Sequence, residues 1–308
     1  MPRRTVLIRA PSNLGLRPLA PHHEPGTWRA PQALTQAGLV DALSPVRIVD
    51  LERPIYQPNA EAGTNLRNGT AIRNFNLALA DCVATLDDDP TSFPLVVGGD
   101  CSILLGALAG CRRRGPLSLV HVDGHSDFRH PGNYDAAAVP GAVGGMALAL
   151  ATGRGEKLLT DWPMVVAPLV PDEQVVQIGE RESRDADFAW PDINDTAITR
   201  IDVFTARELG IADVIARTQA TLRKKPDWPF WIHFDVDVLD QTLMPAVDCP
   251  GSPGIDEADL ILLLGTLVTD ERCAGMTVTI FDPDLDPQAK YAHRLVSMLR
   301  KVFSERFA

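Results

Sequence analysis

The sequence predicts an α/β protein in which helices cover both faces of a central, mainly parallel sheet of about eight strands. Short apolar runs rich in β-branched residues alternate along the chain with longer segments of helical period, which is the pattern of repeated βα units. Loops rich in proline and glycine follow two of these runs, as expected where strands end. No internal repeat or low-complexity tract divides the chain. The 308 residues, 1–308, are therefore expected to form a single domain.

Eight short runs are expected to be strands because each is apolar and rich in β-branched or aromatic residues, which pack well in a sheet. In chain order they are Thr5–Ala10, Val46–Leu51, Phe93–Val97, Leu117–Asp123, Val175–Ile178, Ile198–Phe204, Phe230–Asp237 and Gly275–Phe281. Six longer segments repeat apolar residues every three or four positions, as helices with one buried face do. They are Gly69–Leu86, Ser102–Arg112, Val143–Ala151, Thr205–Leu222, Asp256–Val268 and Gln288–Phe303. Thr205 and Glu208 have the spacing of a capping box, which predicts a helix start there.

The composition excludes several classes of partner. The formal net charge is −11, and the lysines and arginines form no long basic stripe. Such a chain repels the phosphates of nucleic acids and the surface of anionic membranes. A small cationic substrate, or metal cations held by acidic loops, fits this charge balance better.

The cysteines and the first residues indicate the compartment. None of the five cysteines has a close partner or a Cys-x-x-Cys spacing, which favours reduced thiols over a disulfide framework. The apolar run Thr5–Ile8 is far shorter than the core of a signal peptide or a membrane span. The expected location is therefore the cytoplasm.

Three clusters of polar residues follow predicted strands and carry the chemistry. They are Gly98-Gly99-Asp100-Cys101, Asp123-x-His125-x-Asp127 and Phe234-Asp235-x-Asp237-x-Leu239-Asp240. In an extended chain alternate side chains project to one face, so the residues of each cluster are expected to converge. Burying so many carboxylates without cations costs several kcal/mol, and bridging aspartates suit two divalent ions about 3.5–4 Å apart. Aspartates at strand ends also serve as caps and turn residues, but three such clusters in this order favour a metal site.

These clusters resemble the three metal motifs of the ureohydrolases, the family of arginase, agmatinase, guanidinobutyrase and formiminoglutamase, and the resemblance extends from Phe93 to Asp286. It implies a three-layer α/β/α, arginase-like metallohydrolase domain that assembles as a homo-oligomer, a trimer or a hexamer. It also implies two manganese ions bridged by a hydroxide, which attacks the carbon of a guanidinium or related C=N group. By position, one ion would be held by Cys101, Asp123, Asp127 and Asp235, and the other by Asp123, His125, Asp235 and Asp237.

Weaker matches suggest where the substrate binds. Glu182 lies in a segment similar to the family's Ile-Gly-x-Arg-Asp, whose acidic residue meets a substrate amine; an ordinary surface carboxylate is the alternative. Asp259 takes the place of a glutamate that binds guanidinium nitrogens, with Glu257 as a second candidate. Asp256 and Asp259 are also suited to cap the following helix and to serve its first turn, and these roles can coexist.

Two positions depart from the family pattern. Cys101 stands where the family has a histidine ligand, and a thiolate shifts preference from manganese toward zinc, cobalt, nickel or iron. The alternative is a buried thiol beside an empty first site. Gly144 replaces the histidine that the resemblance implies for proton transfer, so the expected catalytic residues are Asp127, Asp259 and, as a substitute shuttle, His130. His130 is otherwise an exposed loop histidine, and His121 and His233 are expected to support the ligands or the core.

Three functions follow from these residues. The first is a metal-dependent hydrolase of a non-peptide C–N bond in a small cationic guanidino or amidino compound, acting through metal-bound hydroxide. The second is a catalytically weak or inactive metal-binding subunit, acting beside an active paralogous subunit, which Cys101 and Gly144 favour. The third is an amide hydrolase like the deacetylases, which work with one zinc. The number of bound metal ions separates the third from the first.

Overall fold

The computed structural model describes residues 3–304 apart from 22, 60–61, 87–88 and 90. Eight strands form one sheet in the order β2-β1-β3-β8-β7-β4-β5-β6, and every neighbouring pair is parallel. The strands are β1 Arg4–Ala10, β2 Arg47–Asp50, β3 Ser92–Gly98, β4 Ser118–Val122, β5 Val175–Ile178, β6 Thr199–Ile201, β7 Phe230–Asp235 and β8 Cys273–Thr279. The prediction of an α/β fold with eight strands is confirmed, and the sheet is wholly rather than mainly parallel.

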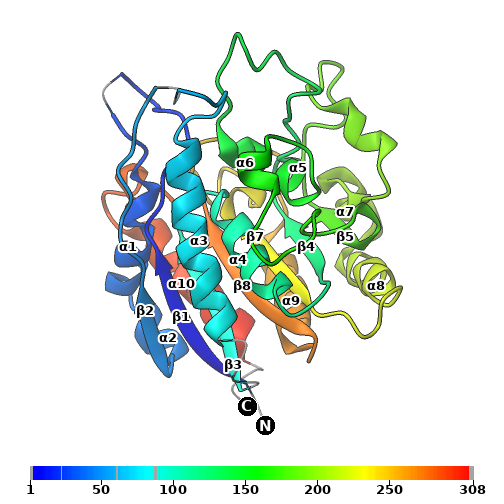
Figure 1. Cartoon of the computed structure of the whole chain (residues 1–308). Helices are drawn as coiled ribbons and strands as arrows, with labels where there is room; N and C mark the ends of the chain where they lie inside the picture. Colours follow the sequence, from blue (N-terminus) through cyan, green and yellow to red (C-terminus); the bar gives the residue numbers. More distant parts are fainter. Residues whose placement is uncertain (1–2, 22, 60–61, 87–88, 90, 305–308) are drawn as a thin grey trace.

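Helices cover both faces of this sheet. The α-helices are α1 Ala30–Gln36, α2 Leu39–Leu43, α3 Gly69–Leu86, α4 Ile103–Arg112, α5 Ala147–Ala151, α6 Lys157–Thr160, α7 Val203–Leu209, α8 Ile211–Leu222, α9 Glu257–Thr269 and α10 Lys290–Ser304. Helices α3, α4, α5 and α6 pack against one another, and α10 packs against α1, α2 and α9. In Figure 1, α3 and α4 lie in front of the sheet and α10 lies behind it. The molecule therefore has three layers.

The central strands are buried because a parallel sheet has helices on both faces. Every residue of β4 and β7 is buried. This burial explains why these strands appear in the sequence as continuous apolar runs rather than as alternating patterns. Among the helices of the described residues, none is long and apolar enough to cross a membrane.

The segment predicted as a strand over Ile198–Phe204 and a helix over Thr205–Leu222 folds differently. β6 ends at Ile201, and the side chain of Asp202 accepts a hydrogen bond from the Thr205 backbone N–H at 2.6 Å, so α7 begins at Val203. The predicted capping box is therefore wrong, because the cap is Asp202. Gly210, with a φ of +76°, separates α7 from α8, so the single predicted helix is two helices.

Three further differences concern short segments. Val143–Met146 is a 3-10 helix that precedes α5, so the predicted helix over Val143–Ala151 has two parts. β7 ends at Asp235 and continues as a 3-10 turn over Val236–Val238. Asp256 is the residue before α9, as predicted, but its side chain accepts no capping hydrogen bond.

Because all strands are parallel, their carboxyl ends meet at one edge of the sheet, where ligands bind in open α/β folds. The four central strands, β3, β8, β7 and β4, are neighbours. The loops after β3, β4 and β7 contain the three clusters that the sequence singled out. Sheet topology thus brings residues more than 130 positions apart in the sequence to one place.

Candidate functional site

The loop after β3 positions Cys101. A Cβ on Gly99 would lie 2.4 Å from the Ser12 carbonyl oxygen, so only glycine lets this loop pack against the end of β1. Asp100 is buried and accepts hydrogen bonds from Ser12 Oγ at 2.6 Å and from the Ser102 backbone N–H at 2.9 Å. Asp100 therefore fixes the loop, and the next residue, Cys101, faces the sheet edge.

The loops after β4 and β7 bring four aspartates and a histidine together. His121 on β4 is in register with His233 on β7, so Asp123 and Asp235 emerge two residues later on neighbouring strands. Asp123 Oδ1 accepts a hydrogen bond from the His125 backbone N–H at 2.7 Å, and Asp235 Oδ1 accepts one from the Asp237 N–H at 2.9 Å. Each carboxylate thus closes a tight turn.

These turns correct the predicted geometry of the clusters. β4 ends at Val122 and Asp127 has a φ of +47°, which is left-handed rather than extended backbone. The expectation that Asp123 and Asp127 converge through an extended chain is therefore wrong. They converge because the loop curls back after the strand.

A short contact joins the first cluster to the third. The Cys101 thiol donates to Asp235 Oδ2 at 2.7 Å and lies 3.4 Å from Thr279 Oγ1. Across the site, His125 Nδ1 lies 2.8 Å from Asp237 Oδ2, and the Gly124 N–H donates to Asp237 Oδ1 at 3.0 Å. The three loops therefore form one continuous polar cluster.

Three overlapping groups in this cluster are suited to hold a metal ion, because in each group the ligand atoms lie within 4.8 Å of one another. The groups are Cys101 with Asp123, His233 and Asp235; His121 with Asp123 and Asp127; and Asp123 with His125 and Asp237. Asp123 belongs to all three. The residues fit divalent cations, since Asp123 Oδ2 and Asp127 Oδ2 are buried without a hydrogen-bond partner among the described residues. Carboxylate oxygens suit manganese, whereas imidazole nitrogen and a sulfur donor suit zinc and iron.

The electrostatics of the cluster also indicate cations. Burial, reinforced by the charges of neighbouring aspartates, raises the pKa values of Asp123, Asp127 and Asp235 well above the usual range. Burial and the charge of Asp235 likewise raise the pKa of the Cys101 thiol. Several carboxyl groups that resist ionisation together are stabilised as carboxylates when divalent cations lie between them.

Unlike the other three aspartates of the cluster, Asp237 is stabilised in its charged form, because it pairs with His125 and each residue stabilises the charge of the other. Burial alone would lower the pKa of His125, but the charge and hydrogen bond of Asp237 raise it to about 10. Burial opposes ionisation of Asp237 as well, yet the charge of His125, with Arg181 nearby, lowers its pKa. A metal bound by both residues would replace the proton that they share here.

Two neutral histidines lie beneath the cluster. The rings of His121 and His233 stack with centroids 4.9 Å apart, and His233 Nδ1 lies 2.9 Å from Thr277 Oγ1. Burial lowers the pKa of both, to about 3 for His233. His233 Nε2 has no hydrogen-bond partner among the described residues and belongs to one candidate ligand group. The position of His233 is therefore compatible with the predicted supporting role and also with a role as a metal ligand.

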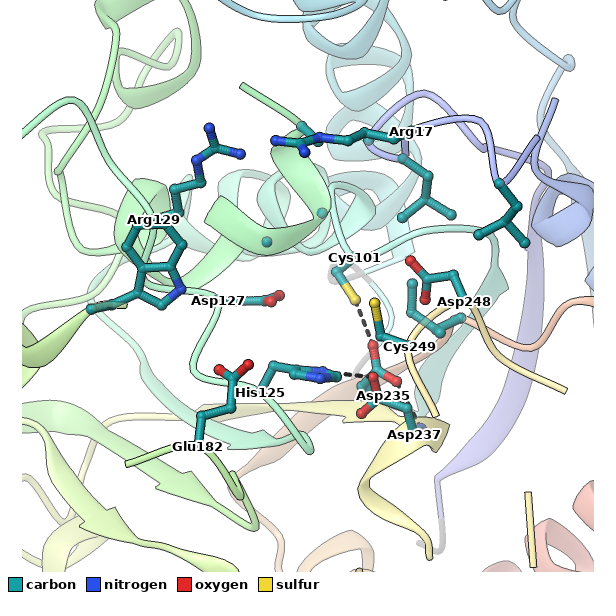
Figure 2. Close-up of a pocket in the computed structure, with 18 of the residues that line it drawn as sticks. Arg17, Cys101, His125, Asp127, Arg129, Glu182, Asp235, Asp237, Asp248 and Cys249 are labelled. Carbon is teal, nitrogen blue, oxygen red and sulfur yellow. Dashed lines mark hydrogen bonds and ion pairs between the residues drawn. The ribbon is translucent and has the colours of Figure 1, made fainter. Parts of the chain in front are cut away.

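A pocket of about 350 Å³ opens from the cluster to the surface. Its buried lining residues, Cys101, Asp127, Asp235 and Asp237, form the floor. Arg17 is exposed and Arg129 and Trp190 are half-buried, so these three residues lie at the mouth. Figure 2 shows His125, Asp127, Asp235 and Asp237 around the same space. Reactive groups at the base of an open pocket are accessible to a small substrate.

Of the three predicted substrate-binding residues, the structure places only one in the pocket lining. Glu182 lines the pocket, and burial raises its pKa. Asp259 lies in the first turn of α9, and Glu257 pairs with Arg294 at 2.7 Å and with Lys301 at 3.8 Å. Neither is among the residues that line the pocket. This placement does not support the predicted contact of Asp259 or Glu257 with a guanidinium group.

His130, the predicted substitute proton shuttle, is held away from the pocket. Its Nε2 lies 2.7 Å from Asp192 Oδ2, and its Nδ1 accepts a hydrogen bond from the Gly132 N–H at 3.1 Å. Both ring nitrogens are therefore engaged in organising the loop, which does not support a role at the reacting group. Gly144, where the resemblance implies a histidine, does line the pocket.

Among the pocket residues that sequence reasoning did not name are two cations, a carboxylate and a thiol: Arg17, Arg129, Asp248 and Cys249. All four lie in loops after the carboxyl ends of strands, and this position was the available signal. Asp248 is partly buried, and burial together with the charge of Asp237 raises its pKa to about 6. Cys249 is exposed, and all five cysteines are free thiols.

Comparison with known proteins identifies the family. A model of the arginase family matches residues 4–304. The arginase of Bacillus caldovelox is 28% identical over 288 residues, 91% of this chain and 93% of that protein, and the arginase of Brevibacillus brevis is 33% identical over 221 residues, 70% of each. The crystal structure of arginase from Bacillus subtilis superposes with a TM-score of 0.82 at 25% identity, covering 97% of this chain and 98% of that one. With this match over the whole sheet and the cluster of aspartates, histidine and Cys101 at its carboxyl edge, the chain belongs to the arginase family of ureohydrolases.

Proposed function

We propose that the protein is a metal-dependent hydrolase that cleaves a non-peptide C–N bond of a small guanidino or amidino compound, acting as one domain over residues 1–308. The observation that carries this proposal is the buried cluster of four aspartates, His125 and Cys101 at the base of an open pocket. Membership of the arginase family supports it. The five free thiols support a cytoplasmic location, and the family supports a homo-oligomer.

The donor set supports two divalent cations. Following the resemblance to the family, we assign one to Cys101, Asp123, Asp127 and Asp235, and the other to Asp123, His125, Asp235 and Asp237. The candidate groups in the structure support this assignment in part, because they join Cys101 to Asp123, Asp235 and His233, and join Asp123 to His125 and Asp237. When bound, such cations acidify a water molecule and polarise the substrate carbon. Manganese is the metal that the family suggests, while the thiol of Cys101 favours zinc, cobalt, nickel or iron.

The chain's own residues then bind the substrate and move protons. Asp127 Oδ2, buried and without a partner among the described residues, accepts a proton from the attacking water. Glu182 binds the positive charge of the substrate, since its carboxylate lines the same pocket. Asp248 lines the same pocket, and burial together with the charge of Asp237 raises its pKa to about 6, so we assign to it the transfer of a proton to the leaving amine in place of the absent histidine.

Elemental analysis of the purified protein, followed by a urea and ammonia release assay over guanidino and amidino compounds, tests the proposal. Two bound divalent ions per chain and release from at least one compound are expected. One zinc ion and hydrolysis of an amide instead would identify a deacetylase-like enzyme.

A second candidate function is supported by Gly144. A glycine cannot transfer a proton, and the Cys101 thiol bonded to Asp235 weakens the first site when it stays protonated. A catalytically weak metal-binding subunit that works beside an active paralogue fits these two features. Bound metal without hydrolysis of any compound in the release assay would favour this candidate.

A further inference from the structure

Two arginines meet at the mouth of the pocket, above its acidic floor. Arg17 comes from the loop after β1, and Arg129 comes from the loop after β4. Figure 2 shows their guanidinium groups directed toward one another, on the side of the pocket where Asp127 points inward. Segments far apart in the sequence thus place two positive charges at the entrance of one cavity.

Neither guanidinium is neutralised by a carboxylate of the described residues. Among the residues that the structure describes, no carboxylate forms an ion pair with Arg17 or Arg129, whereas Arg154 and Arg272 each pair with an aspartate at 2.6–2.7 Å. Arg129 Nε is also buried without a hydrogen-bond partner. Two like charges this close repel one another, so an anion between them would be favoured.

Aromatic rings hold Arg129 in place. Its guanidinium carbon lies 3.9 Å from the centroid of the Tyr134 ring and 5.8 Å from that of Trp190, which also lines the pocket. Stacking on an aromatic face leaves the edge of a guanidinium free to donate two parallel hydrogen bonds, which match the two oxygens of a carboxylate. The acidic floor, with Asp127, Glu182 and Asp248, favours an anion with a single charge over a phosphate.

We propose that Arg17 and Arg129 form an anion subsite that binds a carboxylate of the substrate, so that the substrate is a guanidino or amidino acid rather than a guanidino alkylamine. This inference rests on the proposed function, which places the cationic guanidino or amidino group of the substrate over the acidic floor. The pocket thus recognises a molecule with opposite charges at its two ends.

Isothermal titration calorimetry on the protein with the divalent metal that it carries on purification tests this subsite. The probes are ω-guanidino carboxylates with one to four methylene groups, each compared with the guanidino alkylamine of equal length. The best carboxylate is expected to bind at least about tenfold more tightly than its amine counterpart, as one charge-assisted pair supplies. Arg17→Gln and Arg129→Gln are each expected to weaken carboxylate binding about tenfold without weakening amine binding.

The exposed Arg223, at the end of α8, provides the matched control, and Arg223→Gln is expected to bind as the parent does. Arg17→Gln keeps the test valid if Arg129→Gln unfolds, because the side chain of Arg17 is exposed. Equal or tighter binding of the amines, unchanged carboxylate binding in the folded variants, or no carboxylate binding at any length would overturn the subsite. Urea release is measured separately. Binding of a carboxylate without urea release would contradict the proposed hydrolase but not the subsite. Urea release from the amines alone would contradict the subsite but not the hydrolase.

Discussion

Replacing Asp123 with alanine tests whether one carboxylate serves more than one cation. Asp123 belongs to all three candidate ligand groups, whereas Asp237 belongs to one. A cation present at 100 times its Kd stabilises a folded protein by about 2.7 kcal/mol. An unfolding entropy of about 2.1 cal/mol/K per residue gives a chain of 308 residues about 650 cal/mol/K. Each filled site therefore raises Tm by about 4 °C, and two sites raise it by about 8 °C.

The assay compares Tm with and without a chelator and counts metal ions by elemental analysis. The parent is expected to lose about 8 °C on chelation, Asp237→Ala about 4 °C, and Asp123→Ala almost nothing because both of its sites are empty. Asp213→Ala, at an exposed carboxylate on α8, controls for the loss of a charge and is expected to respond as the parent does. Two metal ions per chain in folded Asp123→Ala would refute the shared-ligand assignment. A parent whose Tm ignores the chelator would refute the metal site itself.

Three other variants test separate parts of the structure. Cys101→His exchanges a sulfur donor for a nitrogen donor beside Asp235. It is expected to raise the ratio of bound manganese to bound zinc, measured by elemental analysis. An unchanged ratio would argue against a ligand role for Cys101. Asp248→Asn is expected to remove the limb near pH 6 from the profile of kcat/KM and to slow hydrolysis about 100-fold, and a profile that keeps this limb would exclude proton transfer by Asp248. Asp202→Ala is expected to cost about 1 kcal/mol of unfolding free energy at pH 7, measured with urea. Burial opposes ionisation of Asp202, but hydrogen bonds from Thr205 and Arg184 outweigh it and lower the pKa, so this contribution is present above about pH 4 and disappears as the pH falls through the folded pKa. A difference that stays constant down to acidic pH would contradict the charged cap.

The fold was predictable because strands that are buried on both faces of the sheet appear in the sequence as continuous apolar runs. β4 and β7 are buried at every position, so they appear as apolar runs that end at polar clusters. Helices α1, α2 and α6 were missed because seven, five and four residues span two turns or fewer, too few for apolar residues to repeat at helical spacing. Gly210 divides α7 from α8 without changing the apolar pattern, so periodicity alone does not reveal the break.

The residues at the base of the candidate site were predictable from the sequence, whereas those at its mouth were not. Asp123, His125 and Asp127 lie within five residues of one another, and their strand fixes where they emerge. The mouth depends on loops, whose paths are set by contacts between distant segments. Arg17 reaches the pocket through such a path, and His130 leaves it because Asp192, 62 residues away, holds the ring.

Gly144 links the missing histidine to the arginine at the mouth. The Gly144 N–H donates to the Gly15 carbonyl oxygen at 2.9 Å, and a Cβ on Gly144 would lie 3.0 Å from Leu16. A Cβ on Gly15 would in turn lie 2.1 Å from Asp100 Oδ1 and 2.8 Å from the Gly144 nitrogen, so this approach requires glycine at position 15. A side chain at 144 would press on Leu16 and on the Gly15 carbonyl oxygen, which precede Arg17 in the same loop. Position 144, where the resemblance implies a proton carrier, and the segment that carries Arg17 are thus coupled through one packing contact, so a change at 144 acts on both parts of the pocket.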